Sequence, residues 1–460
     1  MGSKPVPWLQ ARYTTRTLAA SQRKEEETMW ISDTYGVNPQ GHLTIAGCDA
    51  VELAKTYGTP LYVLDENAIR TALRAYKQSI EASCPNGGMT AYASKACSFK
   101  ELYRIVAEEG CGADVVSGGE LYTALQAGFP AENLIFHGNN KTDAELRMAL
   151  ENGVGRLVVD NREELRALAE LAGRMGKTAR ILLRITPGID AHTHSFIRTG
   201  QIDSKFGFTL ETGDALDAVK EALKTPGIEV CGLHCHIGSQ IFDEQPFEHA
   251  AEVMAGFLAE IREATGAVLT DLNLGGGFGI AYTKDDHPKA GGEYMRLVAD
   301  ALRRRTEALG LPFPYLIIEP GRSVVGPAGA TLYTVGGVKR IPGVRDYVRI
   351  DGGMTDNPRY ALYQAAYTAV VADRADKPAD WRVTIAGRCC ESGDLIQENT
   401  PIQPCDRGDV LAVLATGAYN YSMSSNYNRL PRPAVVLIKD GVSRVAVKAE
   451  TYADLLRNDC

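Results

Sequence analysis

Between about residues 88 and 320 this sequence repeats one unit eight times: a short apolar run, then an amphipathic helix. The alternation predicts a parallel sheet, and eight units predict closure into a (β/α)8 TIM-like barrel. A doubly wound open sheet is the alternative, but no G-x-G-x-x-G motif follows the first strand. The eight predicted strands are Met89–Ala93, Gly112–Val116, Asn133–Phe136, Arg156–Val159, Arg180–Ile185, Glu229–Cys235, Asp271–Leu274 and Tyr315–Ile318.

After Ala330 the pattern changes to strands separated by Gly, Pro and Asp turns, without regular helices between them. This pattern predicts an all-β second domain, Greek-key or β-sandwich-like. We expect residues 30–60, including His42–Ile45, to pair with it. The predicted division is therefore a barrel at 61–320 and a non-contiguous β domain at 29–60 plus 321–460. The later strands are expected at Thr331–Val338, Arg345–Ile350, Trp381–Ala386, Val410–Leu414 and Val435–Lys439.

Composition narrows the class of protein. A chain that is 45% hydrophobic and 23% charged is typical of a soluble globular protein. The 57 acidic residues outnumber the 49 Lys and Arg, so a nucleic-acid partner is not indicated, and no apolar run approaches a membrane span. Ten unevenly spaced cysteines indicate reduced thiols and a cytoplasmic location. Residues 1–28 lack the apolar core of a secretory signal and are expected to be a disordered leader.

Unusual residues gather where the predicted barrel strands end, which is where this fold places its chemistry. Lys95 follows the first strand, His234 to Ser239 follow the sixth, Gly275-Gly276-Gly277 follow the seventh, and Glu319 to Arg322 follow the eighth. A desolvated lysine amine favours the neutral form that condenses with an aldehyde, although such a lysine more often reaches solvent or pairs with a carboxylate. This clustering predicts the active site at the mouth of the barrel.

Two further patterns each have a structural and a functional interpretation. The triple glycine is either a tight turn or a backbone cradle for a phosphate, with Ser239 and Arg322 as further ligands. Glu319 either forms a surface ion pair with Arg322 or is the partner that keeps a heterocyclic nitrogen protonated. A Schiff-base lysine, a phosphate cradle and a pyridinium partner, with an imidazole from the run His234-Cys235-His236 stacked on a flat ring, together describe the site of pyridoxal 5′-phosphate (PLP).

The run His234-Cys235-His236 also has a metal interpretation, because side chains two apart on a strand share a face. Further ligands would have to come from His192, His194 or Cys389-Cys390. A structural histidine and an imidazole stacked on a flat ring are the alternatives, and ring stacking is the preferred one. A metal-dependent barrel hydrolase that uses His234 and His236 is therefore the rival from a different class of enzyme.

The chain resembles the fold-type III PLP-dependent decarboxylases, most closely the diaminopimelate decarboxylases, from about Thr59 to Pro433. The resemblance implies that Lys95 is the Schiff-base lysine and that Cys390 is the proton donor. The motifs that carry it are Tyr92-Ala93-Ser94-Lys95-Ala96, Ser204-Lys205-Phe206-Gly207, Gly232 to Gln240, Gly275-Gly276-Gly277-Phe278-Gly279, Glu319-Pro320-Gly321-Arg322, Cys390-Glu391-Ser392-Gly393-Asp394 and Gly417-Ala418-Tyr419.

The resemblance also assigns the remaining site residues. For the cofactor, it implies that His236 stacks on the ring, that Glu319 pairs with the pyridine nitrogen, and that Asp114 and Arg184 support the lysine and the ring. The implied phosphate ligands are Ser239, Gly277 and Tyr419, within a loop that includes Gly275 and Gly276. For the substrate, it implies Arg322, Arg359 and Tyr363 at a distal carboxylate, Glu391 at a distal amine, and Tyr419 as a further substrate contact. Cys390 and Glu391 are implied to reach the site across a homodimer interface.

The implied reaction is decarboxylation of meso-2,6-diaminopimelate at its D-centre to L-lysine and CO2, the last step of lysine biosynthesis. A related decarboxylase of a D- or L-basic amino acid or a carrier-bound amino acid is the nearest alternative. An alanine racemase would need a tyrosine base in place of the Cys390 turn. A catalytically silent homologue is disfavoured by the intact lysine and cysteine.

Overall fold

A computed structural model describes residues 30–189 and 203–460 of the chain. Eight parallel strands close into a barrel: β5 (Gly88–Ala93), β6 (Gly112–Val115), β7 (Leu134–Phe136), β8 (Arg156–Val159), β9 (Ala179–Thr186), β11 (Ile228–His234), β12 (Asp271–Asn273) and β13 (Tyr315–Ile318). The pairing of β13 with β5 and of β8 with β9 completes the ring. The barrel prediction is confirmed, and each predicted strand is present within one or two residues of its expected ends.

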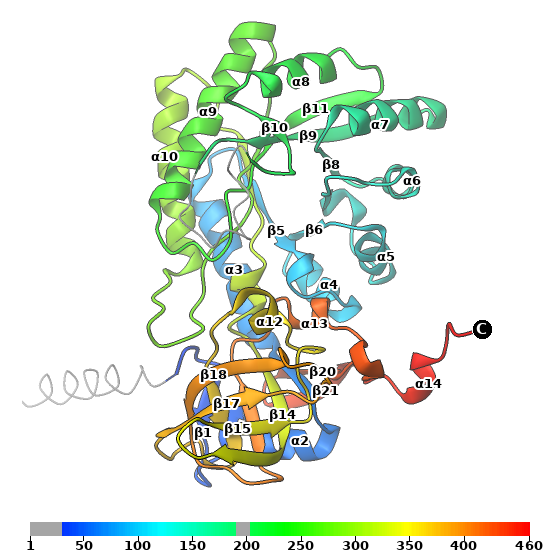
Figure 1. Ribbon diagram of the computed structural model, residues 1–460. Coiled ribbons are helices and arrows are strands. Elements are labelled where there is room, and N and C mark those ends of the chain that lie inside the picture. Colours follow the sequence, from blue (N-terminus) through cyan, green and yellow to red (C-terminus); the bar gives the residue numbers. More distant parts are fainter. Residues whose placement is uncertain (1–29, 190–202) are drawn as a thin grey trace, which may run out of the picture.

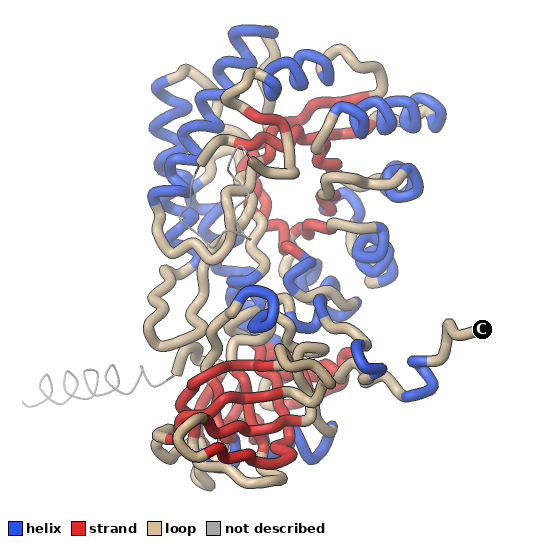
Figure 2. The backbone as a smooth tube through the Cα atoms, viewed as in Figure 1, coloured by secondary structure: helices blue, strands red, loops and turns tan. Residues whose placement is uncertain are grey.

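Helices surround the strands, as the tube in Figure 2 shows. Their apolar faces pack on the outer face of the strands in the largest hydrophobic cluster of the molecule. A smaller cluster comes from alternate positions on six strands, among them Met89, Ala91 and Ile317, and fills the barrel interior. The helices are α3 (Glu66–Ser83), α4 (Lys100–Glu108), α5 (Gly118–Gln126), α6 (Asp143–Asn152), α7 (Arg162–Met175), α8 (Asp214–Ala222), α9 (Gln245–Thr265) and α10 (Gly291–Ala308).

The second domain is a separate, mostly antiparallel sheet, drawn below the barrel in Figure 1. Its long central strand β14 (Gly329–Ile341) pairs with three neighbours, β4, β15 and β19. The five strands predicted after Ala330 are all present, whereas β4, β16, β18 and β21 were not predicted as strands. The other strands are β4 (Leu61–Asp65), β15 (Arg345–Ile350), β16 (Ala369–Val371), β17 (Trp381–Ala386), β18 (Leu395–Ile402), β19 (Val410–Val413), β20 (Ala434–Lys439) and β21 (Val442–Val447).

Two sequence-based expectations about the N-terminal region are wrong in detail. The strands β1 (Tyr35–Val37), β2 (Leu43–Ile45) and β3 (Cys48–Asp49) form their own three-stranded sheet. They pack on the second domain through side chains and do not join its hydrogen-bonded sheet. Conversely β4, which was assigned to the barrel domain, pairs with β14 and β20. All five of its residues are buried, as in a central strand covered on both faces.

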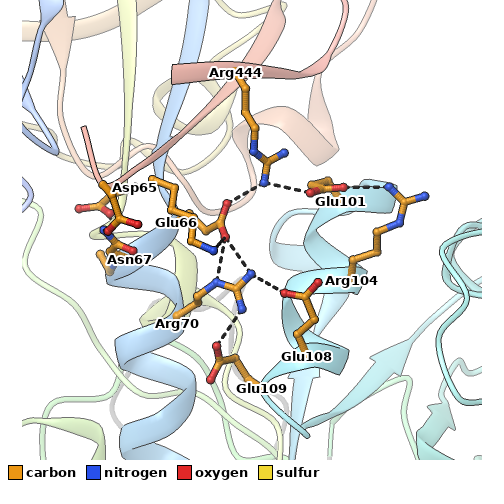
Figure 3. Close-up of polar contacts among 12 residues, drawn as sticks. Asp65, Glu66, Asn67, Arg70, Glu101, Arg104, Glu108, Glu109 and Arg444 are labelled. Carbon is orange, nitrogen blue, oxygen red and sulfur yellow. Dashed lines mark hydrogen bonds and ion pairs between the residues drawn. The ribbon is translucent and has the colours of Figure 1, made fainter. Parts of the chain in front are cut away.

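An ionic cluster joins the barrel to the second domain beside β4 (Figure 3). The Glu66 carboxylate, at the start of α3, lies 2.8 Å from the Arg70 guanidinium and 2.7 Å from that of Arg444, on β21. Arg70 also pairs with Glu108 and Glu109, at the end of α4. The cluster therefore fixes α3, α4 and β21 relative to one another.

The described residues contain no helix that is both long enough and apolar enough to cross a bilayer. All ten cysteines are free thiols. The predicted leader, residues 1–28, and the conceivable ligands His192 and His194 lie outside the described residues.

Candidate active site

A cavity of about 660 Å³ lies at the carboxyl ends of the barrel strands and is covered by residues of the second domain. Its size is that of a typical site for a cofactor and a small substrate. Most of the residues singled out in the sequence line it: Lys95, Asp114, Arg184, His236, Ser239, Gly276, Gly277, Glu319, Arg322, Arg359, Tyr363 and Tyr419. Gly275 lies directly beside this lining, whereas Cys390 and Glu391 are absent from it.

Lys95 lies in a single 3-10 turn (Ser94–Ala96) immediately after β5. The Ser94 hydroxyl donates to the Glu120 carboxylate over 2.9 Å, and the Tyr419 N–H donates to the Ala96 carbonyl over 2.6 Å, so both flanks of the lysine are fixed. Its side chain is exposed to the cavity and forms no ion pair with any described residue. The lysine is thus held in place at its backbone while its amine stays accessible.

Glu319 follows β13 and is buried at the cavity wall. Its carboxylate accepts hydrogen bonds of 2.6 Å from His137 Nε2 and from Asn273 Nδ2, with His234 Nε2 at 3.4 Å. Burial alone would raise the pKa of Glu319, but these neighbours hold it well below its usual value. Burial lowers the pKa of His234 to about 3, so the His234 imidazole is neutral. The lowered pKa of Glu319 therefore rests mainly on His137 and on the hydrogen bonds to the carboxylate. The group is a carboxylate anion.

The alternative of a surface ion pair between Glu319 and Arg322 is wrong. Both side chains are buried, and no such pair forms. Arg322 Nη2 instead donates to the Ser239 hydroxyl over 2.8 Å, while its buried Nε has no hydrogen-bond partner among the described residues. An unpaired donor beside a hydroxyl is suited to receiving an oxyanion.

Asp114 and Arg184 complete the polar wall. Burial raises the pKa of Asp114 to about 7, although the charges of His137 and Lys95 oppose the shift. One Asp114 oxygen has no hydrogen-bond partner among the described residues. Arg184 stacks over the Phe206 ring at 4.1 Å, and its Nε lies 3.8 Å from Asp160. Asp114 and Arg184 therefore place one carboxyl group and one cation at the cavity wall.

The triple glycine passes so close to its neighbours that it has no room for side chains. A Cβ on Gly276 would lie 2.1 Å from the Glu319 carbonyl oxygen, and one on Gly277 would lie 2.4 Å from that of Gly238. The Gly276 N–H donates to His236 Nδ1 over 3.3 Å, which orients that imidazole. The loops after β11, β12 and β13 therefore form one cradle beside Ser239 and Arg322.

Two buried arginines, Arg322 and Arg359, lie among aromatic rings with no carboxylate of the described residues paired to either one. Arg322 Nη1 donates to the Tyr282 hydroxyl over 2.6 Å, and Arg359 Nη1 donates to it over 2.9 Å. Arg359 also donates to the Tyr367 hydroxyl over 2.8 Å. Uncompensated buried cations make this part of the cavity a site for an anionic group.

Cys390 and Glu391 are exposed on the surface of the second domain and lie outside the cavity of their own chain. Their turn is held by the Asp394 carboxylate, which accepts from the N–H groups of Met354 and Cys389 over 2.6 Å each. Burial raises the pKa of Cys389 to about 11, which makes it a poor source of protons.

The metal interpretation of His234 and His236 is not supported by the geometry. β11 ends at His234, so the alternation that would align the two imidazoles stops before His236. Within the described part of the chain, the ligand atoms that gather belong to His137, His234 and Glu319, and two hydrogen bonds already join them.

Sequence reasoning missed three residues of this site: His137, Tyr282 and Tyr367. His137 immediately follows β7, so the strand-end rule applied to the third strand finds it. Tyr282 and Tyr367 lie in loops after β12 and before β16, and no sequence pattern brings them to the arginines.

The donors around the cavity fit PLP. An accessible lysine amine suits its aldehyde, a buried carboxylate suits its ring nitrogen, and the cradle with Ser239 and Arg322 suits its phosphate. Residues 66–326 match the family described as pyridoxal-dependent decarboxylase, pyridoxal binding domain. Fold, site and family match together define a barrel-type PLP-dependent decarboxylase.

The comparisons narrow this class further. The diaminopimelate decarboxylase of Bacillus subtilis is 51% identical over 431 residues, which cover 94% of this chain and 98% of that protein. The crystal structure of diaminopimelate decarboxylase from M. jannaschii in co-complex with L-lysine has a TM-score of 0.87 at 38% identity, covering 94% of this chain and 99% of that one. The Helicobacter pylori enzyme complexed with L-lysine gives 0.81 at 32%, covering 88% and 98%. The chain belongs to the diaminopimelate decarboxylase family.

Proposed function

We propose that this protein removes CO2 from the D-centre of meso-2,6-diaminopimelate and releases L-lysine, with PLP as its cofactor. One observation carries the proposal: a single cavity joins an accessible lysine and a buried carboxylate to two buried arginines that have no carboxylate partner within residues 30–189 and 203–460. The relatives' names, and the L-lysine in the M. jannaschii complex, support this substrate and product. The metal-dependent hydrolase alternative has no support among them.

When bound, PLP supplies an aldehyde for the substrate amine and a pyridinium that accepts the electron pair left by CO2. Lys95 would hold the cofactor through its amine, and Ser239, Gly277 and Tyr419 would bind its phosphate. His236 would lie against the ring. Glu319, held as an anion by its neighbours, would keep a proton on the ring nitrogen.

Arg322, Arg359 and Tyr363 would bind the distal carboxylate of the substrate. Because one guanidinium forms bidentate contacts with a carboxylate, two of them fix both its position and its orientation. A substrate without this group would leave two buried cations uncompensated, which disfavours simple monocarboxylic amino acids. This preference separates the proposed substrate from the basic amino acids of related decarboxylases.

Cys390 and Glu391 would come from the second subunit of a homodimer. Both are exposed on a turn whose main chain is held by Asp394, and neither lines the cavity of its own subunit. At a dimer interface the Cys390 thiol would deliver a proton to the carbon that loses CO2, and Glu391 would contact the distal amine. The ten free thiols are consistent with the cytoplasm as the proposed location.

The test is release of lysine and CO2 by the PLP-loaded protein from meso-diaminopimelate, with D-lysine, D-ornithine and L-arginine assayed alongside. We expect turnover of diaminopimelate and loss of both activity and the visible absorbance band in Lys95→Ala. Lys100→Ala, on the exposed face of α4 and outside the cavity, is the matched control and should retain both. Turnover of another amino acid in preference to diaminopimelate would contradict the substrate assignment.

A further inference from the structure

Tyr282 lies between the two arginines of the cavity. It is in the loop after β12 and is 6% exposed, and its ring lines the cavity wall. The centroid of this ring lies 5.8 Å from the Arg322 guanidinium and 5.1 Å from that of Arg359. Its hydroxyl oxygen receives one hydrogen bond from each arginine, of 2.6 and 2.9 Å. One phenol thus links both cations.

The hydroxyl hydrogen of Tyr282 is not used by these two hydrogen bonds. A guanidinium has only donors, so both bonds from the arginines must use lone pairs of the Tyr282 oxygen. The oxygen can accept two hydrogen bonds and donate one, so its own O–H can still donate a hydrogen bond. No described residue accepts a hydrogen bond from it. Tyr282 lines the cavity, and its buried phenol proton therefore has no acceptor among the described residues.

The orientation of Tyr282 is fixed by its surroundings. Its N–H donates to Asp286 over 3.0 Å, and its carbonyl accepts from the Thr368 hydroxyl over 2.9 Å. Its ring meets the Tyr367 ring edge-on, with centroids 5.2 Å apart and planes at 85°. A donor held rigidly between two cations suits a carboxylate, because the O–H and both positive charges can then act on the same anion.

We propose that Tyr282 donates its O–H to the distal carboxylate of the substrate, beside Arg322 and Arg359, and so helps to select a dicarboxylic over a monocarboxylic amino acid. This inference rests on the proposed function and adds a substrate-binding residue to it. It also explains why two like charges tolerate one another at this point: the phenol oxygen accepts from both, and the carboxylate neutralises them.

The test is Tyr282→Phe, measured on the PLP-loaded enzyme with meso-diaminopimelate as substrate and with pimelate and D-lysine as competing ligands. Pimelate carries the carboxylate without the amines, and D-lysine lacks the distal carboxylate. Because a hydrogen bond to a charged group is lost, we expect kcat/KM for diaminopimelate to fall about 10- to 100-fold, mainly through KM. Inhibition by pimelate should weaken by a similar factor, while inhibition by D-lysine should change less than about twofold.

Tyr367→Phe is the matched control, because it removes a hydroxyl that accepts a hydrogen bond from Arg359 but lies outside the cavity lining. The Tyr367 hydroxyl accepts from the same Arg359 and from Asn420, but it does not line the cavity. We expect this variant to weaken pimelate inhibition less than about threefold. Equal effects of the two substitutions, or an equal loss for pimelate and D-lysine in Tyr282→Phe, would overturn the donor role.

A crystal structure of the wild-type enzyme with PLP and pimelate tests the same point if Tyr282→Phe does not fold. The phenol oxygen should lie about 2.5–3.0 Å from a carboxylate oxygen, and a separation beyond about 4 Å would overturn the proposal. Failure of the wild-type enzyme to turn over diaminopimelate would refute the proposed function instead. The distance from the Tyr282 hydroxyl to pimelate in the crystal structure would still report on Tyr282 in that case.

Discussion

The substitution Glu66→Gln tests whether the ionic cluster of Figure 3 holds the two domains together. The Glu66 side chain is 1% exposed and lies within ion-pair distance of three cations: Arg70 at 2.8 Å, Arg444 at 2.7 Å and Lys439 at 3.3 Å. Glutamine keeps the shape of this side chain and removes its charge. The experiment therefore isolates the electrostatic contribution of one buried carboxylate.

The structure gives the expected size of the effect. Leaving a buried charge uncompensated costs roughly 3–5 kcal/mol, whereas losing one hydrogen bond to a charged group costs about 1.5–3 kcal/mol. Arg70 retains Glu108 and Glu109, and Arg444 retains Glu101, so neither arginine is left unpaired. We therefore expect the free energy of unfolding to fall by about 2–3 kcal/mol.

The assay is urea unfolding of the PLP-loaded enzyme at pH 7, followed by circular dichroism and by fluorescence, with the first transition compared between variants. Glu52→Gln is the control, because Glu52 and its partner Lys55 are 62% and 65% exposed and their pair should contribute nothing measurable. A difference below about 0.5 kcal/mol between wild type and Glu66→Gln would refute the argument.

The pH dependence of the free energy of unfolding tests the same ion pairs independently. Although burial opposes it, the three cations lower the pKa of Glu66 below its ordinary value of 4.5. A carboxylate with a lowered pKa in the folded state contributes stability above its unfolded pKa and loses it as the pH falls through the folded pKa. The gap between wild type and Glu66→Gln should therefore be constant above about pH 5 and close only below about pH 4.5.

Three further predictions concern the cavity. Arg359→Ala should lower kcat/KM for diaminopimelate at least about 100-fold, because it removes one of the two buried cations proposed to bind the distal carboxylate. Inhibition by D-lysine should stay within about twofold of wild type. Unchanged diaminopimelate kinetics would contradict the substrate assignment. Glu319→Gln should lower kcat about 100-fold or more and alter the absorbance of the bound cofactor, because the ring nitrogen loses its anionic partner; a normal kcat would exclude that role. Cys390→Ala should lower kcat with little change in KM, whereas Cys389→Ala should leave activity intact. If Cys390 acts across a dimer interface, the activity of the wild-type enzyme should also fall on dilution below the dimer dissociation constant.

The sequence determined the barrel and the position of its active site. Strand and helix periodicities depend on neighbouring residues only, so the eight alternating units can be recognised in the sequence before the pairing of any strand is known. Because all strands of a barrel run in one direction, residues after their carboxyl ends must meet, which brought Lys95, Gly276 and Glu319 together. The motif residues of the second domain, Arg359 and Tyr419, were found only through a resemblance to a known family.

Tertiary structure alone decided the remainder, because it depends on contacts between distant parts of the chain. Residues 61–65 were assigned to the barrel domain without a predicted strand, and only the pairing of β4 with β14 and β20 places them in the second sheet. Nothing local to Tyr282 shows that Arg359, 77 residues later, donates to its hydroxyl. The exposure of Cys390, away from the cavity of its own chain, is likewise a property of the folded surface. Periodicity records which face of an element is buried, whereas hydrogen-bond geometry is fixed only when loops from separate elements converge.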